Sequence, residues 1–245
     1  MGAWLNRWLP VPASAHAGEF DAVLAAAHVE GLIVFASWLA IFVLILVRFR
    51  ARPGRPAGAS AGVWPLVAIA AVVLGDVWLL AGSALPAWWR RAEPPPQGGV
   101  EVRVVGEQFA WNVHYPGLDG RFGRTDRALI TAADPLGVDR TDPAAVDDFV
   151  LINLLVLPAG RPAVVHLASK DVIHSFTLAE MRVKQDITPG LTTTTWFTPT
   201  ATGAWEIGCS QLCGLGHYRM RGVFEVRPLA DWEAFVRDEV ALVAP

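Results

Sequence analysis

The sequence has few cysteines and no excess of basic residues, so it lacks the composition typical of haem-carrying, disulfide-rich or nucleic-acid-binding proteins. Only two of its 245 residues are cysteines, and they do not form the C-x-x-C-H motif that attaches a c-type haem. The 20 basic and 23 acidic residues leave a formal net charge of −3, which gives no indication of nucleic-acid binding. Internal repeats and low-complexity tracts are also lacking. The chemistry of the chain is therefore concentrated in a small number of residues.

Long apolar runs, by contrast, are present and predict a transmembrane hairpin over residues 22–91. Hydrophobic residues make up 53% of the chain, and the mean hydropathy is +0.38. Two runs, at about 28–48 and 63–85, are long enough to cross a bilayer as helices. The arginines between them are Arg48, Arg50, Arg52 and Arg55. Because arginine-rich short loops stay in the cytoplasm, we expect both termini outside it, including an uncleaved, irregular segment over residues 1–21.

Asp76 stands inside the second apolar run, beside Gly75. An ionisable side chain in hydrocarbon is costly and normally faces protein, a partner or water. We therefore expect Asp76 to face the helices of a larger membrane subunit. A role in proton movement is left open by the sequence.

The remainder of the chain predicts a mainly β domain. Residues 92–99 are rich in proline and glycine and predict a linker, followed by a domain over residues 100–228 and a helix over residues 229–245. The predicted strands cover residues 100–105, 111–115, 149–157, 163–168, 192–197, 204–207 and 223–226. Many short strands between Pro- and Gly-containing turns favour a sandwich or a barrel.

One loop, Gly208–Met220, contains both cysteines. Cys209 and Cys213 are followed by His217 and Met220. Thiolate and thioether ligands select copper or an iron–sulfur cluster, and imidazole also suits copper. A disulfide is the simplest alternative for two cysteines outside the cytoplasm, and zinc is another, although zinc gains nothing from a methionine.

This loop, C-x-x-x-C-G-x-x-H-x-x-M, resembles the binuclear CuA loop of subunit II of haem–copper oxidases. The segment Ser169–Phe176 resembles the family's S-x-D-V-x-H-S-[WF] segment, which supplies an earlier histidine, His174. The resemblance covers roughly residues 9–237. It implies a cupredoxin-like Greek-key β-sandwich that carries the copper loop at one end.

The resemblance also implies the ligands of two copper ions. Cys209 and Cys213 would bridge the ions. One ion would be completed by His174 and Met220, and the other by His217 and the backbone carbonyl of Gln211. No nucleophile–base pair or open metal position is recognisable in the sequence, so bond-breaking chemistry is expected in a partner.

The implied function is that of subunit II of a respiratory cytochrome c oxidase in a bacterial-type inner membrane. It would take electrons from cytochrome c or a related cytochrome and pass them to the haems of subunit I, with subunit III as a further partner. The CuA subunit of a nitric oxide reductase is an alternative within the superfamily. A membrane-tethered copper-binding or copper-delivery protein is an alternative of another class.

Residues at two further surfaces follow from the resemblance. The family often has W-x-W where this chain has Phe109 and Trp111, so Phe109 stands at the position that receives the electron. Asp171 either helps to dock a basic cytochrome, because acidic surface groups steer such partners, or is an ordinary exposed Asp that begins a turn. The segment around Lys184 and Asp186 resembles one at the boundary with subunit I.

Two departures limit what the resemblance implies. Many members have Glu at the position of Gln211, where its side chain also binds magnesium; a neutral amide is a poor ligand, so magnesium is not expected here. Many also have an acid ahead of the tryptophan that opens the second span. Residues 60–63, directly ahead of Trp64, include no acid, and Glu30 lies at the outer end of the first span. Proton uptake is therefore expected to use another subunit or to be arranged differently.

Overall fold

The computed structural model describes residues 7–48, 50 and 62–243, so Arg52 and Arg55 of the predicted cytoplasmic loop lie outside the described residues. The chain forms two compact units. One comprises residues 1–9 and 19–93, and the other comprises residues 10–18 and 94–245. The short segment 10–18 therefore belongs with the C-terminal unit, although its last two residues, Ala17 and Gly18, begin the first long helix.

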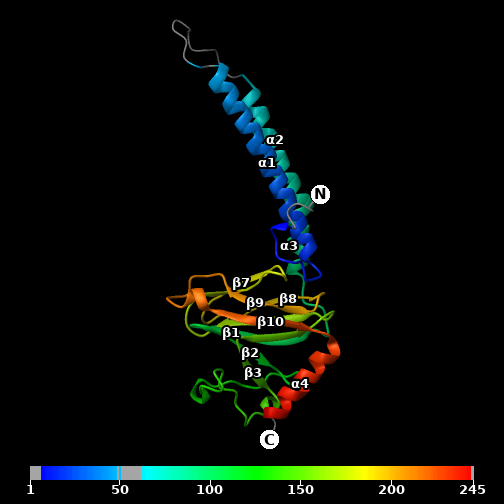
Figure 1. Cartoon of the computed structure of the whole chain (residues 1–245), viewed down its shortest axis with the longest axis vertical. Coiled ribbons are helices and arrows are strands. Elements are labelled where there is room, and N and C mark those ends of the chain that lie inside the picture. The colour runs from blue at the N-terminus through cyan, green and yellow to red at the C-terminus, as the bar shows by residue number, and fades with distance from the viewer. Residues whose placement is uncertain (1–6, 49, 51–61, 244–245) are drawn as a thin grey trace. The chain divides into compact units, whose positions relative to one another are not determined.

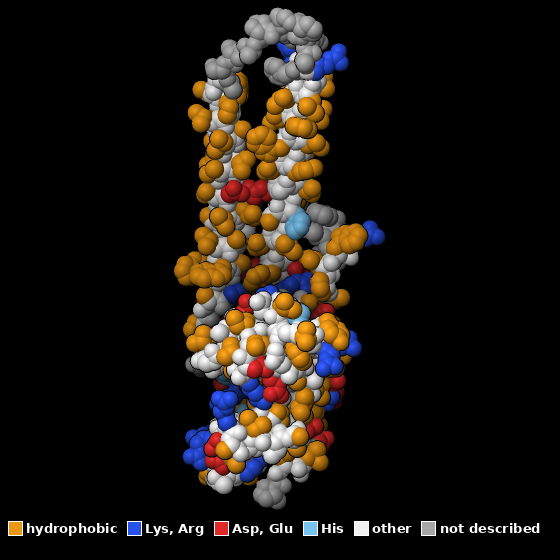
Figure 2. Space-filling model, turned by 90° about the vertical axis from the view of Figure 1, so that its left-hand side faces the viewer, with side chains coloured by type: hydrophobic (Ala, Val, Ile, Leu, Met, Phe, Trp, Pro, Cys, Tyr) orange, Lys and Arg blue, Asp and Glu red, His pale blue; other side chains and the backbone are white. Residues whose placement is uncertain are grey.

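The first unit consists of long apolar helices. Helix α1 spans Ala17–Arg48. Helix α2, Trp64–Leu79, continues through a π-helical turn, Leu80–Ala84, into α3, Leu85–Ala92. Both continuous helices are long and apolar enough to cross a membrane, as predicted. Hydrophobic side chains cover their surfaces (Figure 2), which is the distribution expected of helices solvated by lipid.

The first helix begins earlier than predicted. It starts at Ala17, whereas the sequence predicted an irregular segment to residue 21. Glu19 lies in the first turn, where a carboxylate is favoured by the helix dipole, and it pairs with Arg90 from α3. This pair and the alanine-rich stretch that follows extend the helix beyond the apolar run alone.

The second unit is a two-layer β-sandwich (Figure 1). One sheet has the strand order β3-β2-β1-β5-β8 and the other β4-β10-β9-β6-β7. The strands of the first sheet are β1 (Val100–Glu107), β2 (Ala110–Tyr115), β3 (Phe149–Ile152), β5 (Ala163–Ser169) and β8 (Thr193–Phe197). Those of the second are β4 (Leu154–Pro158), β6 (His174–Leu178), β7 (Val183–Ile187), β9 (Gly203–Cys209) and β10 (Arg221–Arg227). This architecture confirms the predicted mainly β, cupredoxin-like fold class.

One predicted strand proves to be two. The apolar run over residues 149–157 is interrupted at Asn153, which adopts a positive φ of 58°. Its side-chain Oδ1 accepts a hydrogen bond from the Trp111 N–H at 2.8 Å. The chain therefore crosses from the first sheet (β3) to the second (β4) at this residue, which has the side chain best suited to that backbone conformation.

The core lies between the two sheets and continues under the C-terminal helix. Its largest fully buried side chains include Trp111, Tyr115, Phe149, Phe176 and Phe224. Helix α4, Leu229–Val243, buries Val236 and Val240, and the Trp232 indole N–H donates to the Val156 carbonyl oxygen at 3.2 Å. This packing fixes the end of the sandwich away from the cysteine loop.

Candidate metal centre

The two cysteines lie close together without forming a disulfide. Cys209 is the last residue of β9, and Cys213 follows in the connection to a short 3-10 turn, His217–Arg219. Their sulfur atoms are 3.8 Å apart and both are free thiols. A disulfide requires a separation of about 2.05 Å. The disulfide alternative is therefore not the state that the structure shows.

His174 reaches the same place from the neighbouring strand. It opens β6, and the β6–β9 pairing sets Phe176 opposite Cys209. The imidazole is fully buried, and its Nε2 donates to Asp171 Oδ1 at 2.9 Å. Its Nδ1 has no hydrogen-bond partner among the described residues. The ligand atoms of His174, Cys209 and Cys213 all lie within 4.8 Å of one another, which leaves a buried nitrogen available to a metal beside two sulfurs.

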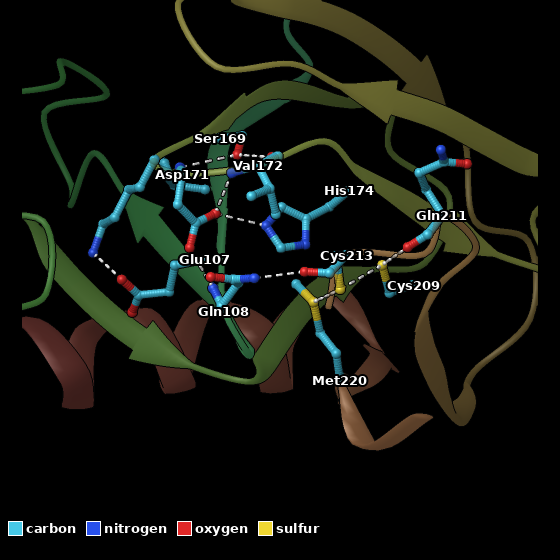
Figure 3. A network of polar contacts seen from close by, with 12 residues as sticks. Glu107, Gln108, Ser169, Asp171, Val172, His174, Cys209, Gln211, Cys213 and Met220 are labelled. Carbon is cyan, nitrogen blue, oxygen red and sulfur yellow. Dashed lines mark hydrogen bonds and ion pairs between the residues drawn. The ribbon is translucent and has the colours of Figure 1, made fainter. Parts of the chain in front are cut away.

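The other predicted ligands lie close to the cysteine pair, and Figure 3 shows Gln211 and Met220 among them. Met220 Sδ and His217 Nδ1 each lie 3.6 Å from Cys213 Sγ. The backbone carbonyl oxygen of Gln211 is 3.2 Å from Cys209 Sγ, whereas its side-chain amide points away from the two sulfurs. All six predicted donors are thus brought together, and Gln211 presents the atom that the resemblance implied.

Burial determines the protonation state of the Cys213 thiol. Desolvation, assisted by the adjacent Cys209, raises the pKa of Cys213 to about 11. The thiol is therefore protonated at neutral pH until a metal displaces the proton. Two thiols, a thioether, two imidazoles and a carbonyl form a soft donor set, so the residues fit copper.

Gln108 and Asp171 join the two halves of the site. The Gln108 side-chain amide donates to the Cys213 carbonyl oxygen at 2.6 Å, and its backbone N–H donates to Asp171 Oδ2 at 2.7 Å. Desolvation raises the pKa of Asp171, but hydrogen bonds from His174, Gln108 and Val172 outweigh it and hold this pKa below its ordinary value. The sequence-based interpretation did not identify Gln108, whose only signal was its place in the aromatic segment.

The two aromatic residues predicted for electron uptake occupy different environments. Phe109 is half-buried, and its ring lies so close to Gly216 that a Cβ there would collide with it. Trp111 is fully buried, with its ring edge-on to the His174 imidazole and to Phe176. Phe109 thus packs on the cysteine loop itself, whereas Trp111 packs beneath the histidine.

The residues predicted to face subunit I lie in both units. Asp186 accepts hydrogen bonds from Ser175 Oγ at 2.6 Å and from Lys184 Nζ at 2.9 Å. Ser175 adjoins His174 in β6, so Asp186 contacts the residue next to this predicted ligand. Asp76 lies in α2, in the unit of long helices.

Comparisons with known proteins show the family to which the chain belongs. Residues 100–226 match the family model for cytochrome c oxidase subunit II, periplasmic domain. The chain is 38% identical over 152 residues to the alternative cytochrome c oxidase subunit 2 of Bradyrhizobium diazoefficiens, covering 62% of this chain and 55% of that protein. It is 29% identical over 215 residues to a probable cytochrome c oxidase subunit 2 of Rickettsia bellii, covering 87% of this chain and 76% of that one.

A solved structure is also similar. It is the periplasmic domain of subunit II of the cytochrome oxidase of Bradyrhizobium japonicum, with 27% identity and a TM-score of 0.46, covering 62% of this chain and all of that one. The Bradyrhizobium diazoefficiens relative, and the cytochrome c oxidase subunit 2 of Cereibacter sphaeroides, are matched over only about half of their own length, 55% and 53%.

Proposed function

Because the chain belongs to the cytochrome c oxidase subunit II family, we propose that it is the electron-accepting subunit of a respiratory cytochrome c oxidase. In this role it takes electrons from cytochrome c or a related cytochrome at a binuclear copper centre. It passes them to the haems of subunit I, where O₂ is reduced. The observation that carries the proposal is the pair of unbonded sulfurs 3.8 Å apart, beside a buried imidazole whose Nδ1 has no hydrogen-bond partner in the described part of the chain.

The proposed ligand roles are those that the family resemblance implies, and the closeness of the donor atoms supports them. Cys209 and Cys213 present two sulfurs to two copper ions, which would exchange one electron at a time with the donor and the acceptor. His174 and Met220 would complete the donor set of one ion, and His217 and the Gln211 carbonyl oxygen would complete that of the other. The side-chain amide of Gln211 is directed elsewhere, so the proposal includes no magnesium.

The protein around the centre holds these atoms in place. His174 is fixed by β6 and by Asp171, and Cys213 is fixed by the amide of Gln108. A centre whose ligands are held by buried strands and outer hydrogen bonds changes geometry little when its charge changes, which favours rapid electron transfer. The chain itself supplies this rigidity and excludes water; it breaks no bonds.

The path of the electron begins at the exposed side of the loop. Phe109 and the adjacent Gly214–Gly216 backbone lie next to His217, so a donor cytochrome that docks here comes close to a ligand. Asp171 is one-third exposed and offers a carboxylate at the edge of this surface. Lys184 and Asp186, with Ser175 behind them, provide polar groups for the boundary with subunit I.

The two long helices anchor the chain in a bacterial-type inner membrane, with the copper domain and both termini on the extracytoplasmic side. Subunit I, subunit III and the lipid bilayer are its proposed partners, and Asp76 faces the partner helices. Nucleic acid has no part in the function.

The experiment that tests the proposal is the copper content and electron paramagnetic resonance spectrum of the full-length chain in detergent. We expect two copper ions per chain and one unpaired electron shared by both nuclei. A single localised copper, or none, would reject the binuclear centre. Turnover of the assembled complex on reduced cytochrome c with O₂, and then with NO, identifies the final acceptor.

A further inference from the structure

The groove between α1 and α2 contains a carboxyl group that the proposed electron relay does not use. A cavity of about 490 Å³ separates the two helices and is lined by side chains of both. Glu30 of α1 lines it, and its carboxyl group lies directly against the backbone of Gly75 in α2, where any Cβ would collide with it. Acidic side chains are visible between the two apolar helices in Figure 2.

The environment of this carboxyl group is almost entirely apolar. Ser37 lines the same cavity, but its hydroxyl donates to the Ile33 carbonyl oxygen within its own helix at 2.7 Å. Within residues 7–48, 50 and 62–243, no hydrogen bond or ion pair engages Glu30. The sequence predicted Glu30 at the outer end of the first span, but α1 begins at Ala17 and sets Glu30 against Gly75, within the second span. A carboxyl group without a partner in hydrocarbon is costly in either protonation state. Its position therefore calls for a donor from outside the chain.

The chemistry of the groove determines what can fill it. A lipid acyl chain would fill the volume but offers no hydrogen-bond donor to Glu30. A transmembrane helix offers both apolar surface and polar side chains. Small residues of both helices, among them Ala26, Ala68, Ala71 and Gly75, line the groove and allow a helix backbone to approach closely.

We propose that this groove receives a transmembrane helix of a partner subunit, which presents a hydrogen-bond donor to Glu30. The inference rests on the proposed function, because that function supplies a membrane-embedded partner. It adds a second acidic contact to Asp76, which is adjacent to Gly75 on α2 but does not line the groove. Because Gly75 has no side chain, it leaves the space that the Glu30 carboxyl group occupies inside the groove.

Crosslinking in the assembled complex tests which molecule occupies the groove. The full chain is produced together with the membrane subunits of its own complex, with benzoylphenylalanine at Val34, which lines the groove, or at Leu32, which does not. We expect position 34 to crosslink to a transmembrane peptide of another subunit that carries a donor side chain, and position 32 not to reach that peptide. A lipid adduct, a crosslink to a second copy of this chain or no crosslink at position 34 would overturn the proposal.

Substitutions test whether Glu30 provides the contact. The readout is the amount of partner subunit retained per chain under increasing detergent. We expect Glu30→Ala and Gly75→Ala each to weaken retention by about 3- to 20-fold, the range of hydrogen bonds between membrane helices. Gly82→Ala is the matched control in the same continuous helix, because no atom lies within 4 Å of its added Cβ; it should behave as the wild type.

A double variant separates this mechanism from general damage to the hairpin. If Gly75→Ala acts only by displacing the carboxyl group, Glu30→Ala/Gly75→Ala should be no weaker than Glu30→Ala alone. Additive losses, or wild-type retention by Glu30→Ala, would refute the proposal. The paramagnetic resonance spectrum of each variant is recorded in parallel. If a variant loses retention of the partner subunit but keeps the copper signal, the substitution has affected the groove and not the copper centre. If the wild type itself lacks the signal, the copper function is rejected independently of the groove.

Discussion

Asp171 Oδ1 accepts a hydrogen bond from His174 Nε2 at 2.9 Å, and this contact determines which nitrogen of the imidazole is free. The Oδ2 atom of the same carboxylate accepts a hydrogen bond from the backbone N–H of Gln108. Gln108 in turn donates to the Cys213 carbonyl oxygen. One side chain thus orients the histidine from β6 and, through Gln108, anchors the loop that carries the second cysteine.

Asp171→Asn is predicted to weaken copper binding while the fold persists. The amide removes the negative charge that holds the Nε2 proton and orients the ring. Losing such an outer contact typically costs 10- to 100-fold in metal affinity. Competition with a copper chelator measures the affinity, and the copper hyperfine pattern should change as well. Asp231→Asn, in the first turn of α4, is the control and should bind copper like the wild type.

Cys213→Ser is predicted to abolish the binuclear centre. A hydroxyl is a harder ligand than a thiolate and stays protonated near neutral pH, so it cannot bridge two copper ions. We expect at most one copper per chain and a spectrum localised on one nucleus. If two copper ions with a shared electron persisted in this variant, the bridging role of Cys213 would be wrong.

Much of the site was predictable because its ligands fall in one short segment. The order of Cys209, Cys213, His217 and Met220 predicts soft-metal chemistry without knowledge of the fold. His174 was predicted through the resemblance, since its approach to the cysteines depends on the pairing of β6 with β9, which spacing along the chain does not reveal.

The parts that escaped prediction depend on tertiary contacts. Strands β6 and β7 were not predicted because each is only five residues long and contains only two hydrophobic residues, Phe176 and Leu178 in β6 and Val183 and Ile187 in β7. The split at Asn153 required its side chain to meet Trp111. Gln108 has an ordinary polar side chain, and its role became apparent only when the loop of Cys213 was placed against it.

Gly216→Ala is predicted to disturb electron uptake by displacing Phe109. The backbone φ of Gly216 is −94°, which any residue can adopt, so the effect comes from collision with the phenyl ring. Overpacking of this kind costs about 1–3 kcal/mol of unfolding free energy. Stopped-flow reduction of the copper-loaded chain by cytochrome c should be slower than in the wild type.

Gly208→Ala provides the comparison for that experiment. It lies on the same strand as Cys209, and no atom lies within 4 Å of its added Cβ. Its rate of reduction and its stability should match the wild type. Equal rates for both variants would show that the position of Phe109 does not limit electron uptake.

Tyr115→Phe is predicted to destabilise the domain and to alter its stability at alkaline pH. The buried hydroxyl donates to the Val156 carbonyl oxygen at 3.1 Å and accepts from the Val156 N–H at 2.7 Å. Removing it leaves the buried N–H of Val156 without this acceptor, at a cost of about 1–3 kcal/mol. Chemical denaturation at neutral pH measures the loss of unfolding free energy.

The pH dependence follows from burial, which raises the pKa of Tyr115 above its ordinary value. The folded chain therefore holds the phenolic proton more tightly than the unfolded chain, whose tyrosine titrates near about 10. The contribution of Tyr115 is fully present below that pH and declines as the pH rises above it. The difference in unfolding free energy between wild type and Tyr115→Phe should accordingly shrink above about pH 10. Tyr218→Phe, at a side chain that is 85% exposed, should show neither effect, and a Tyr115→Phe difference that stayed constant with pH would contradict this assignment.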